Sequence, residues 1–189
     1  MPDGLTFYLA ARYSRREELC AYKADLEARG HRVPARWLLG EHQVNGLEAA
    51  RAVEDDGPVP ADQAVLFAQD DVEDLLAADV VVSFTTEPRS GATRGGRHVE
   101  FGIALGIRRS GGTVRRLFIV GPLENVFHAL PEVDGAYDEW SAFLAHLDAQ
   151  PAQHGRGRYT DAVCLEHPWH KSHSLHEKIF AGPMKEATP

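Results

Sequence analysis

The sequence is poor in cysteine, in long apolar runs and in surplus positive charge, and each shortage excludes a class of protein. Its two cysteines, Cys20 and Cys164, form no CxxC pair, so neither a disulfide framework nor a zinc ribbon is encoded. No run of about 18 apolar residues and no basic-then-apolar start is present, which predicts a cytoplasmic protein without membrane contact. With 20 Lys and Arg against 28 Asp and Glu, the net charge of −8 disfavours binding to a nucleic acid polymer.

Two common nucleotide-binding motifs are also missing. Dinucleotide-binding folds place glycines directly after the first strand so that the backbone can approach a pyrophosphate. This chain has Ala10-Ala11-Arg12-Tyr13 at that point. A Walker A loop is absent as well. Hydride transfer with a nicotinamide cofactor and the usual route to ATP or GTP hydrolysis are therefore disfavoured.

Apolar runs of strand length alternate with segments of helical periodicity along most of the chain. The clearest strand is 79–84, whose continuous β-branched run is typical of a strand covered on both faces. Further strands are predicted at 5–10, 31–38, 117–120 and 136–140, and helical segments at 15–29, 65–78, 97–109, 125–130 and 143–147. Pro34 indicates that the 31–38 strand lies at a sheet edge, because proline cannot donate a hydrogen bond to a neighbouring strand. This order predicts an α/β fold, a doubly wound parallel sheet of about five strands with a ligand cleft at their carboxyl ends.

The composition changes after residue 149. Residues 150–189 hold five of the ten histidines and show no periodic core face, so we divide the chain into a domain at 1–149 and a C-terminal arm at 150–189. Cysteine and histidine recur in the arm at three-residue intervals, a spacing that suits zinc ligands on one side of a helix. These residues are Cys164, His167, His170, His173 and His176. Pro168 and the polar flanks favour a His-rich polar arm instead, and we predict no metal site.

The most informative segment follows the 79–84 strand. It is Gly95-Gly96-Arg97-His98-Val99-Glu100-Phe101-Gly102. Glycines let a loop approach a ligand closely, and the N-terminus of a following helix favours an anion. Glu100 falls in the first turns of that helix, where an acidic residue also stabilises the helix dipole, so a purely structural role is the alternative interpretation. The small neighbours Gly102 and Ala104 favour a ligand role, because they leave room beside the carboxylate.

Three features in one order support a resemblance to a known family. They are Tyr8-Leu9-Ala10 in the first strand, Asp71 upstream of the 79–84 strand, and the Gly95 to Gly102 segment with its central Glu100. Over roughly residues 5–147 the chain resembles the nucleoside 2-deoxyribosyltransferase family. Relatives of that family include hydrolases of 2'-deoxynucleoside 5'-monophosphates and of cytidine monophosphate. The resemblance implies a flavodoxin-like fold and an enzyme that acts on the N-glycosidic bond.

The resemblance also implies roles for three residues. Glu100 corresponds to the nucleophile, whose carboxylate attacks the anomeric carbon, expels the nucleobase and forms a glycosyl ester. Tyr8 matches the tyrosine that orients the nucleophile, with packing in the sheet core as the alternative. Asp71 matches a carboxylate close to the departing base, although the acids at 70, 73 and 74 are equally consistent with a solvated helix face.

One position departs from the family pattern. The transferase has an Asp six residues before the nucleophile, and Arg94 stands there in this chain. A guanidinium does not give up a proton near neutrality, but it binds phosphate. Ser90, Gly91 and the amides of Gly95 and Gly96 are suited to the same ligand, which favours a 5'-phosphorylated substrate. A solvated loop arginine is the alternative.

Three other residues complete the predicted site. Trp37, at the end of the 31–38 strand, is placed to stack a nucleobase, with core packing as the alternative. Arg12, in the turn after the first strand, is predicted to contact sugar or phosphate, with a solvated side chain as the alternative. By the resemblance, Asn125 binds the sugar 5' end in a neighbouring subunit, which presupposes a homo-oligomer of two or more chains.

We therefore predict an enzyme that moves deoxyribose between nucleobases through a covalent glycosyl-Glu100 intermediate. Hydrolysis of a nucleoside 5'-monophosphate to free base is one alternative. Cleavage of NAD and a catalytically silent nucleotide-binding module are two others. No metal or organic cofactor is expected, because the electrophile is the sugar itself, and the expected partner is a small nucleoside or nucleotide.

Overall fold

Four short parallel strands form one sheet in the computed structural model, which describes residues 4–40, 61–85 and 95–150. The strands are β1 (Phe7–Ala10), β2 (Val80–Phe84), β3 (Arg116–Val120) and β4 (Gly135–Tyr137). They lie in the order β1-β2-β3-β4, with Val81 of β2 opposite Tyr8 on one side and Leu117 on the other. The central strand β2 is buried along its whole length, as its continuous apolar run predicts.

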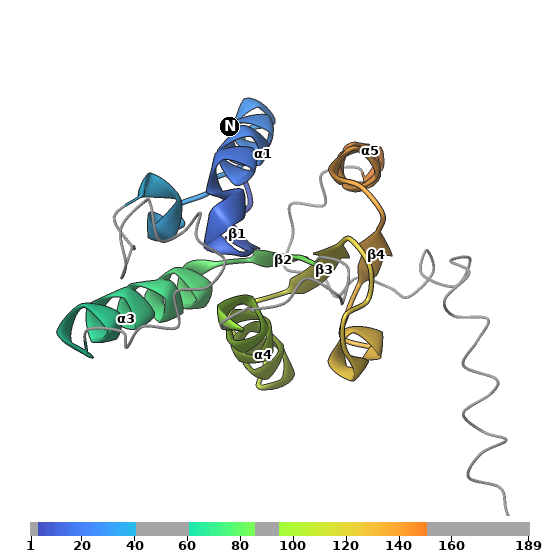
Figure 1. Ribbon diagram of the computed structural model, residues 1–189. Coiled ribbons are helices and arrows are strands. Elements are labelled where there is room, and N and C mark those ends of the chain that lie inside the picture. Colours follow the sequence, from blue (N-terminus) through green and yellow to red (C-terminus); the bar gives the residue numbers. More distant parts are fainter. Residues whose placement is uncertain (1–3, 41–60, 86–94, 151–189) are drawn as a thin grey trace, which may run out of the picture. The chain divides into compact units, whose positions relative to one another are not determined.

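Helices alternate with the strands and cover both faces of the sheet. They are α1 (Arg16–Ala28), α3 (Ala61–Ala77), α4 (Gly96–Arg109) and α5 (Trp140–Ala149), with short 3-10 turns η1 (Tyr13–Arg15), η2 (Arg36–Leu39) and η3 (Val126–Ala129). Figure 1 shows α1 and α5 on one face and α3 and α4 on the other. The α/β class and the parallel sheet predicted from the sequence are confirmed. Among the helices described, none is long and apolar enough to cross a bilayer.

Side chains of β1 alternate between the two helical layers, because successive residues of a strand point to opposite faces. Phe7 packs edge-on against Phe143 of α5, with ring centroids 6.5 Å apart. Phe143 is fully buried, and burial of such a ring stabilises the fold by about 2–3 kcal/mol. Tyr8 points to the other face, where it contacts Glu100 of α4. Aromatic packing therefore occupies the α1/α5 face, and the chemistry predicted from the sequence lies on the α3/α4 face.

The predicted edge strand at 31–38 is wrong. Arg32 makes a single parallel bridge to Thr6, and after Pro34 the chain turns into η2. Proline has no amide hydrogen for a further ladder bond, which ends the pairing. The sheet of the described residues consequently has four strands instead of about five, and Trp37 lies on a 3-10 turn instead of at the end of a strand.

Arg36 fixes α3 against η2. Its guanidinium contacts the carboxylates of Asp70, Glu73 and Asp74, and its backbone amide donates a 2.7 Å hydrogen bond to Asp74. These acids lie on one side of α3, so the helix face predicted as solvated is paired with a cation. Asp71, about 100° further around the helix axis than Asp70, lies off this stripe.

The predicted C-terminal boundary of the domain coincides with the end of the last described helix. Helix α5 ends at Ala149, as far as the predicted domain extends. Residues 151–189, with the His-rich arm, lie outside the described residues, so the division of the chain at 149 stays a prediction.

Candidate active site

Tyr8 and Glu100 meet on the α3/α4 face of the sheet. The Tyr8 hydroxyl donates a hydrogen bond of 2.7 Å to Glu100 Oε1. Tyr8 is 1% exposed, and Glu100 Oε2 is covered and has no hydrogen-bond partner in the described part of the chain. The carboxyl group therefore has one oxygen held in place and a second oxygen that no described group engages.

The backbone before α4 determines where Glu100 lies. Gly95 has a φ of 72°, a left-handed conformation that glycine adopts without strain and that other residues rarely adopt. Gly96 then begins α4, and Glu100 lies one turn further along the helix. A Cβ atom on Gly96 would meet no atom within 4 Å, which leaves open space at the start of the helix. A Cβ atom on Gly95 would likewise meet no atom within 4 Å, so the two predicted site glycines differ only in the left-handed φ of Gly95.

The surroundings of Glu100 disfavour its charged form. Burial is the main cause that raises the pKa of Glu100, to about 8. The hydrogen bond from Tyr8 and the positive charge of Arg97 lower this pKa, and the negative charge of Asp71 raises it further. Burial, and then the charge of Glu100, raise the pKa of Tyr8 well above its ordinary value, so Tyr8 remains a hydrogen-bond donor. A covered carboxyl group with a strongly shifted pKa beside a fixed donor is typical of catalytic sites.

Asp71 is the acid of α3 whose charge acts on both Tyr8 and Glu100, while the charge of Asp74 acts on Tyr8 alone of the two. The negative charge of Asp71 raises the pKa of both Tyr8 and Glu100, which places its carboxylate near them. The neighbouring acids of α3 are instead engaged by Arg36, as described above. The structure therefore brings together Tyr8, Asp71 and Glu100 from β1, α3 and α4.

Arg12 lies at the edge of the same cluster. It precedes η1, and burial lowers its pKa, with Arg97 of α4 adding to the decrease and Glu124 opposing it. The charges of Arg97 and Glu124 therefore both act on the Arg12 guanidinium. Its position is consistent with the predicted contact to sugar or phosphate.

Comparison with known proteins gives a structural match but no match to a family model or a curated sequence. The structure is similar to that of a 2-deoxyribosyltransferase from Bacillus psychrosaccharolyticus, with a TM-score of 0.51 and 14% identity over 84% of this chain and 95% of that chain. The chain has the fold of a 2-deoxyribosyltransferase. A Clostridium botulinum CMP N-glycosidase is also similar, with a TM-score of 0.44 and 17% identity over 77% of this chain and 99% of that one.

The flavodoxin-like α/β fold implied by the sequence resemblance is thus confirmed. At this level of identity the likeness establishes the fold alone.

One buried ion pair in this chain was not predicted from the sequence. Arg97 donates to both carboxylate oxygens of Glu124, with Nη2 at 2.7 and 2.9 Å and Nε at 3.2 Å. The side chains are 4% and 8% exposed. The ion pair joins the first turn of α4 to the segment after β3. No spacing rule connects two residues in separate elements, so the pair had no signal beyond the presence of each charge.

Asn125 has contacts within its own chain. Its side-chain oxygen accepts a 2.9 Å hydrogen bond from the Phe127 amide and caps η3. Its amide nitrogen lies 3.3 Å from His98 Nδ1 and 3.0 Å from His128 Nε2. Burial lowers the pKa of His128 to about 4, so this ring is neutral at pH 7. Binding of a sugar in a neighbouring subunit by Asn125 stays a prediction.

Trp37 is packed in the core of the deoxyribosyltransferase fold. It is 5% exposed, and its indole N–H donates a 3.1 Å hydrogen bond to the Leu9 carbonyl. Its ring lies 6.2 Å from that of Tyr13. These contacts favour the core-packing alternative, and stacking of a nucleobase on Trp37 stays a prediction that the burial does not support.

The remaining predicted residues, Ser90, Gly91 and Arg94, lie outside the described residues. Their proposed contact with phosphate stays a prediction. Within ranges 4–40, 61–85 and 95–150, no group of three or more His, Cys, Asp or Glu side chains is arranged to hold a metal ion.

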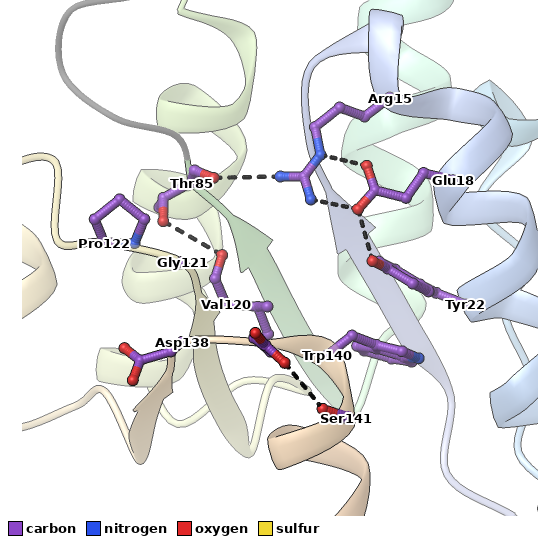
Figure 2. Close-up of a pocket in the computed structure, with 11 residues that line it drawn as sticks. Arg15, Glu18, Tyr22, Thr85, Val120, Gly121, Pro122, Asp138, Trp140 and Ser141 are labelled. Atoms are coloured by element: carbon purple, nitrogen blue, oxygen red, sulfur yellow. Dashed lines mark hydrogen bonds and ion pairs between the residues drawn. The ribbon is translucent and has the colours of Figure 1, made fainter.

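A separate surface pocket of about 450 Å³ lies between α1 and the start of α5. Figure 2 shows Arg15, Glu18 and Tyr22 on one wall, Trp140 next to Tyr22 with their rings stacked 4.5 Å apart, and Asp138 on the other side. Arg15 donates two 2.7 Å bonds to Glu18, and the Tyr22 hydroxyl donates a 2.6 Å bond to the same carboxylate. Since the polar groups of this wall bind one another and no predicted site residue lines the pocket, we assign the candidate chemistry to the Tyr8–Glu100 cluster.

Proposed function

We propose that the protein is an N-glycosidic-bond enzyme acting on nucleosides or nucleotides, with Glu100 as its nucleophile. The observation that supports this most strongly is the covered Glu100 carboxyl, in which Tyr8 holds Oε1 and no described group engages Oε2. Attack on an anomeric carbon requires a carboxylate oxygen that is both positioned and free of water. The fold shared with a 2-deoxyribosyltransferase agrees with this chemistry.

The proposed reaction has two displacement steps. Oε2 of ionised Glu100 forms a bond to the anomeric carbon as the bond to the base nitrogen breaks, and the base leaves with the bonding electrons. A second base, or water, then attacks the same carbon, and the carboxylate departs, so the anomeric configuration is retained. Asp71, whose charge acts on Glu100, is the group that binds the departing base and exchanges its proton in this proposal.

A 5'-phosphorylated substrate is the second candidate for the same site. The charge of Arg97 on α4 acts on Arg12, and Ser90, Gly91 and Arg94 belong to the segment that precedes that helix. Cationic and amide donors of this kind bind phosphate. The substrate is then a nucleoside 5'-monophosphate, and the product of its hydrolysis is the free base.

The test is incubation with a panel of ribo- and deoxyribonucleosides and their 5'-monophosphates, with and without a second free base. Chromatography of the products identifies the bond, the sugar, the phosphate requirement and the acceptor together. We expect release of a base, and a new nucleoside where transfer occurs. An NAD arm tests release of nicotinamide. Tight binding of a monophosphate without any released base over long incubation would instead support a silent binding module.

Asp71→Asn is expected to reduce the rate of base release by about 100-fold, because the substituted amide cannot exchange a proton with the base. Asp70→Asn is the matched control. It makes the same substitution one residue earlier, where the carboxylate pairs with Arg36, and surface pairs contribute about 1 kcal/mol or less. We expect Asp70→Asn to keep its activity. Equal activities of the two variants in steady-state assays, with unchanged circular dichroism, would assign Asp71 no part in the reaction.

Exposed apolar side chains near the start of α4 support the predicted homo-oligomer. Val99 of α4 is 62% exposed and Phe127 of η3 is 59% exposed, and Asn125 links the two segments by lying 3.3 Å from His98 and accepting from the Phe127 amide. Exposed apolar groups gathered on adjacent elements are typical of protein–protein contacts. We propose that a second copy of the chain covers this surface, close to Asn125.

Sedimentation or light scattering tests this assembly. We expect a mass of at least twice the 20.8 kDa of the chain, and a shift toward the single-chain mass in Val99→Glu. Ala145→Glu, at an exposed position on the opposite layer, is the matched control and should keep the larger mass. A wild-type protein of single-chain mass at micromolar concentration would contradict the proposal.

A further inference from the structure

The Arg97–Glu124 ion pair is more deeply buried than the other ion pairs of the described residues. Its side chains are 4% and 8% exposed, and three hydrogen bonds join them. Removing two charges from water costs free energy that their mutual attraction often fails to recover, and apolar side chains of similar size commonly stabilise a fold as well. Fold stability alone therefore gives no strong reason for a buried pair at this position.

The position of the pair suggests another role. Arg97 lies three residues before Glu100 on α4, a spacing that puts two side chains on neighbouring turns of the same helix side. The positive charge of Arg97 lowers the pKa of Glu100, and it also lowers those of Arg12 and His98. The ion pair thus lies among the polar groups that surround the candidate nucleophile.

Charged and titratable groups face Glu100 from three elements. Tyr8 approaches from β1 and donates to Oε1, Asp71 approaches from α3 with a negative charge, and Arg97 lies on α4 itself. Of the described groups whose charge acts on Glu100, Arg97 is the cation. Its charge opposes both burial and Asp71, which disfavour an ionised carboxyl group.

We propose that Arg97 is a positioning residue whose buried charge keeps Glu100 ionisable, and that Glu124 limits how much of this charge acts on Glu100. The bidentate contact holds the guanidinium in one place and neutralises part of its charge. The two partners then act on Glu100 in opposite directions. This role deepens the proposed function, on which it rests, but the ionisation of Glu100 can be measured without any substrate.

The experiment is a pH titration of the Glu100 carboxyl carbon by 13C NMR, in protein labelled at glutamate Cδ. Glu100→Gln assigns the signal, because only that resonance disappears. In Arg97→Gln we expect the midpoint to rise by about one pH unit or more above the wild-type value. In Glu124→Gln we expect it to fall, because the guanidinium is no longer neutralised. A pair that only supports the fold would not move the midpoint in opposite directions.

Further variants separate charge from folding. Arg97→Lys keeps the charge and should restore most of the wild-type midpoint. If Arg97→Gln does not fold, the double variant Arg97→Met with Glu124→Met removes both charges at similar volume, and it should raise the midpoint as well. An unchanged midpoint in a folded variant without Arg97, or shifts of one sign in both single variants, would overturn the proposal.

Activity provides a second readout. The acid limb of the pH profile of kcat/KM reports the ionisation of the free enzyme, so it should move in the same directions as the NMR midpoints. If no substrate in the panel is turned over, the proposed function fails while the titration still decides the role of Arg97. If turnover occurs and the midpoints do not move, the role of Arg97 fails and the proposed function stands.

Discussion

Glu100→Gln is expected to abolish base release and, at the same time, to make the protein more stable at alkaline pH. Removal of a nucleophile lowers turnover by about 10⁴-fold or more. The gain in stability follows from the raised pKa of Glu100, which is about 8 against an ordinary value of 4.5. In that interval the folded state keeps a proton that the unfolded state releases, so the wild-type protein loses stability as the pH rises from about 4.5 to 8.

Glutamine is neutral at every pH and avoids this loss. One pH unit corresponds to about 1.4 kcal/mol, so the variant should exceed wild type by up to about 4 kcal/mol at pH 8, and by little at pH 4. Urea denaturation of both proteins at the two pH values measures the difference. Glu17→Gln, at an exposed position on α1, is the matched control and should show no such pattern. Full turnover by Glu100→Gln, or equal stabilities at pH 8, would contradict the assignment.

Tyr8→Phe should lower the rate of base release by about 100-fold and move the acid limb of the pH profile to higher pH. The substitution removes the 2.7 Å hydrogen bond to Glu100 Oε1 and keeps the ring in the core. Loss of one fixed donor to a reacting group costs about 10²- to 10³-fold in rate. The same hydrogen bond lowers the pKa of Glu100, so its loss leaves the carboxyl group protonated up to a higher pH.

Tyr22→Phe is the matched control for this prediction. It removes a hydroxyl that donates to Glu18 on the α1/α5 face, in the wall of the separate pocket. Steady-state assays across the pH range should give the wild-type profile for Tyr22→Phe and a displaced one for Tyr8→Phe. Identical profiles for the two variants would show that the Tyr8 hydroxyl has no influence on Glu100.

The sequence predicts the elements whose signals are local. The strand at 79–84 is observed as β2, and the helix predicted at 15–29 is observed as α1 over Arg16–Ala28. Both signals are local, because the spacing of apolar residues within one segment decides which of its side chains can pack on the core. The edge strand at 31–38 fails for a tertiary reason. Its apolar residues are buried, but η2 buries them instead of a strand after Pro34. Burial was predictable from composition, and backbone conformation was not.

The residues of the candidate site were likewise only partly predictable from the sequence. Tyr8, Asp71 and Glu100 belong to motifs that place them at the ends or faces of particular elements, and the structure brings them together. The family resemblance singles out Asp71 among the acids of α3, but the residue pattern alone does not, because the distinction depends on the contacts of Arg36 with the other acids. Arg97 and Glu124 lie 27 positions apart in separate elements, and no local pattern relates them.

Arg36 also has a consequence for how this protein tolerates change. It holds η2 to the second half of α3, although residues 41–60 separate these two elements in the sequence. The free energy of closing such a stretch varies only slowly with its length. We therefore expect changes in the number of residues between η2 and α3 to leave the Arg36 contacts, and with them the packing of α3 on η2, intact.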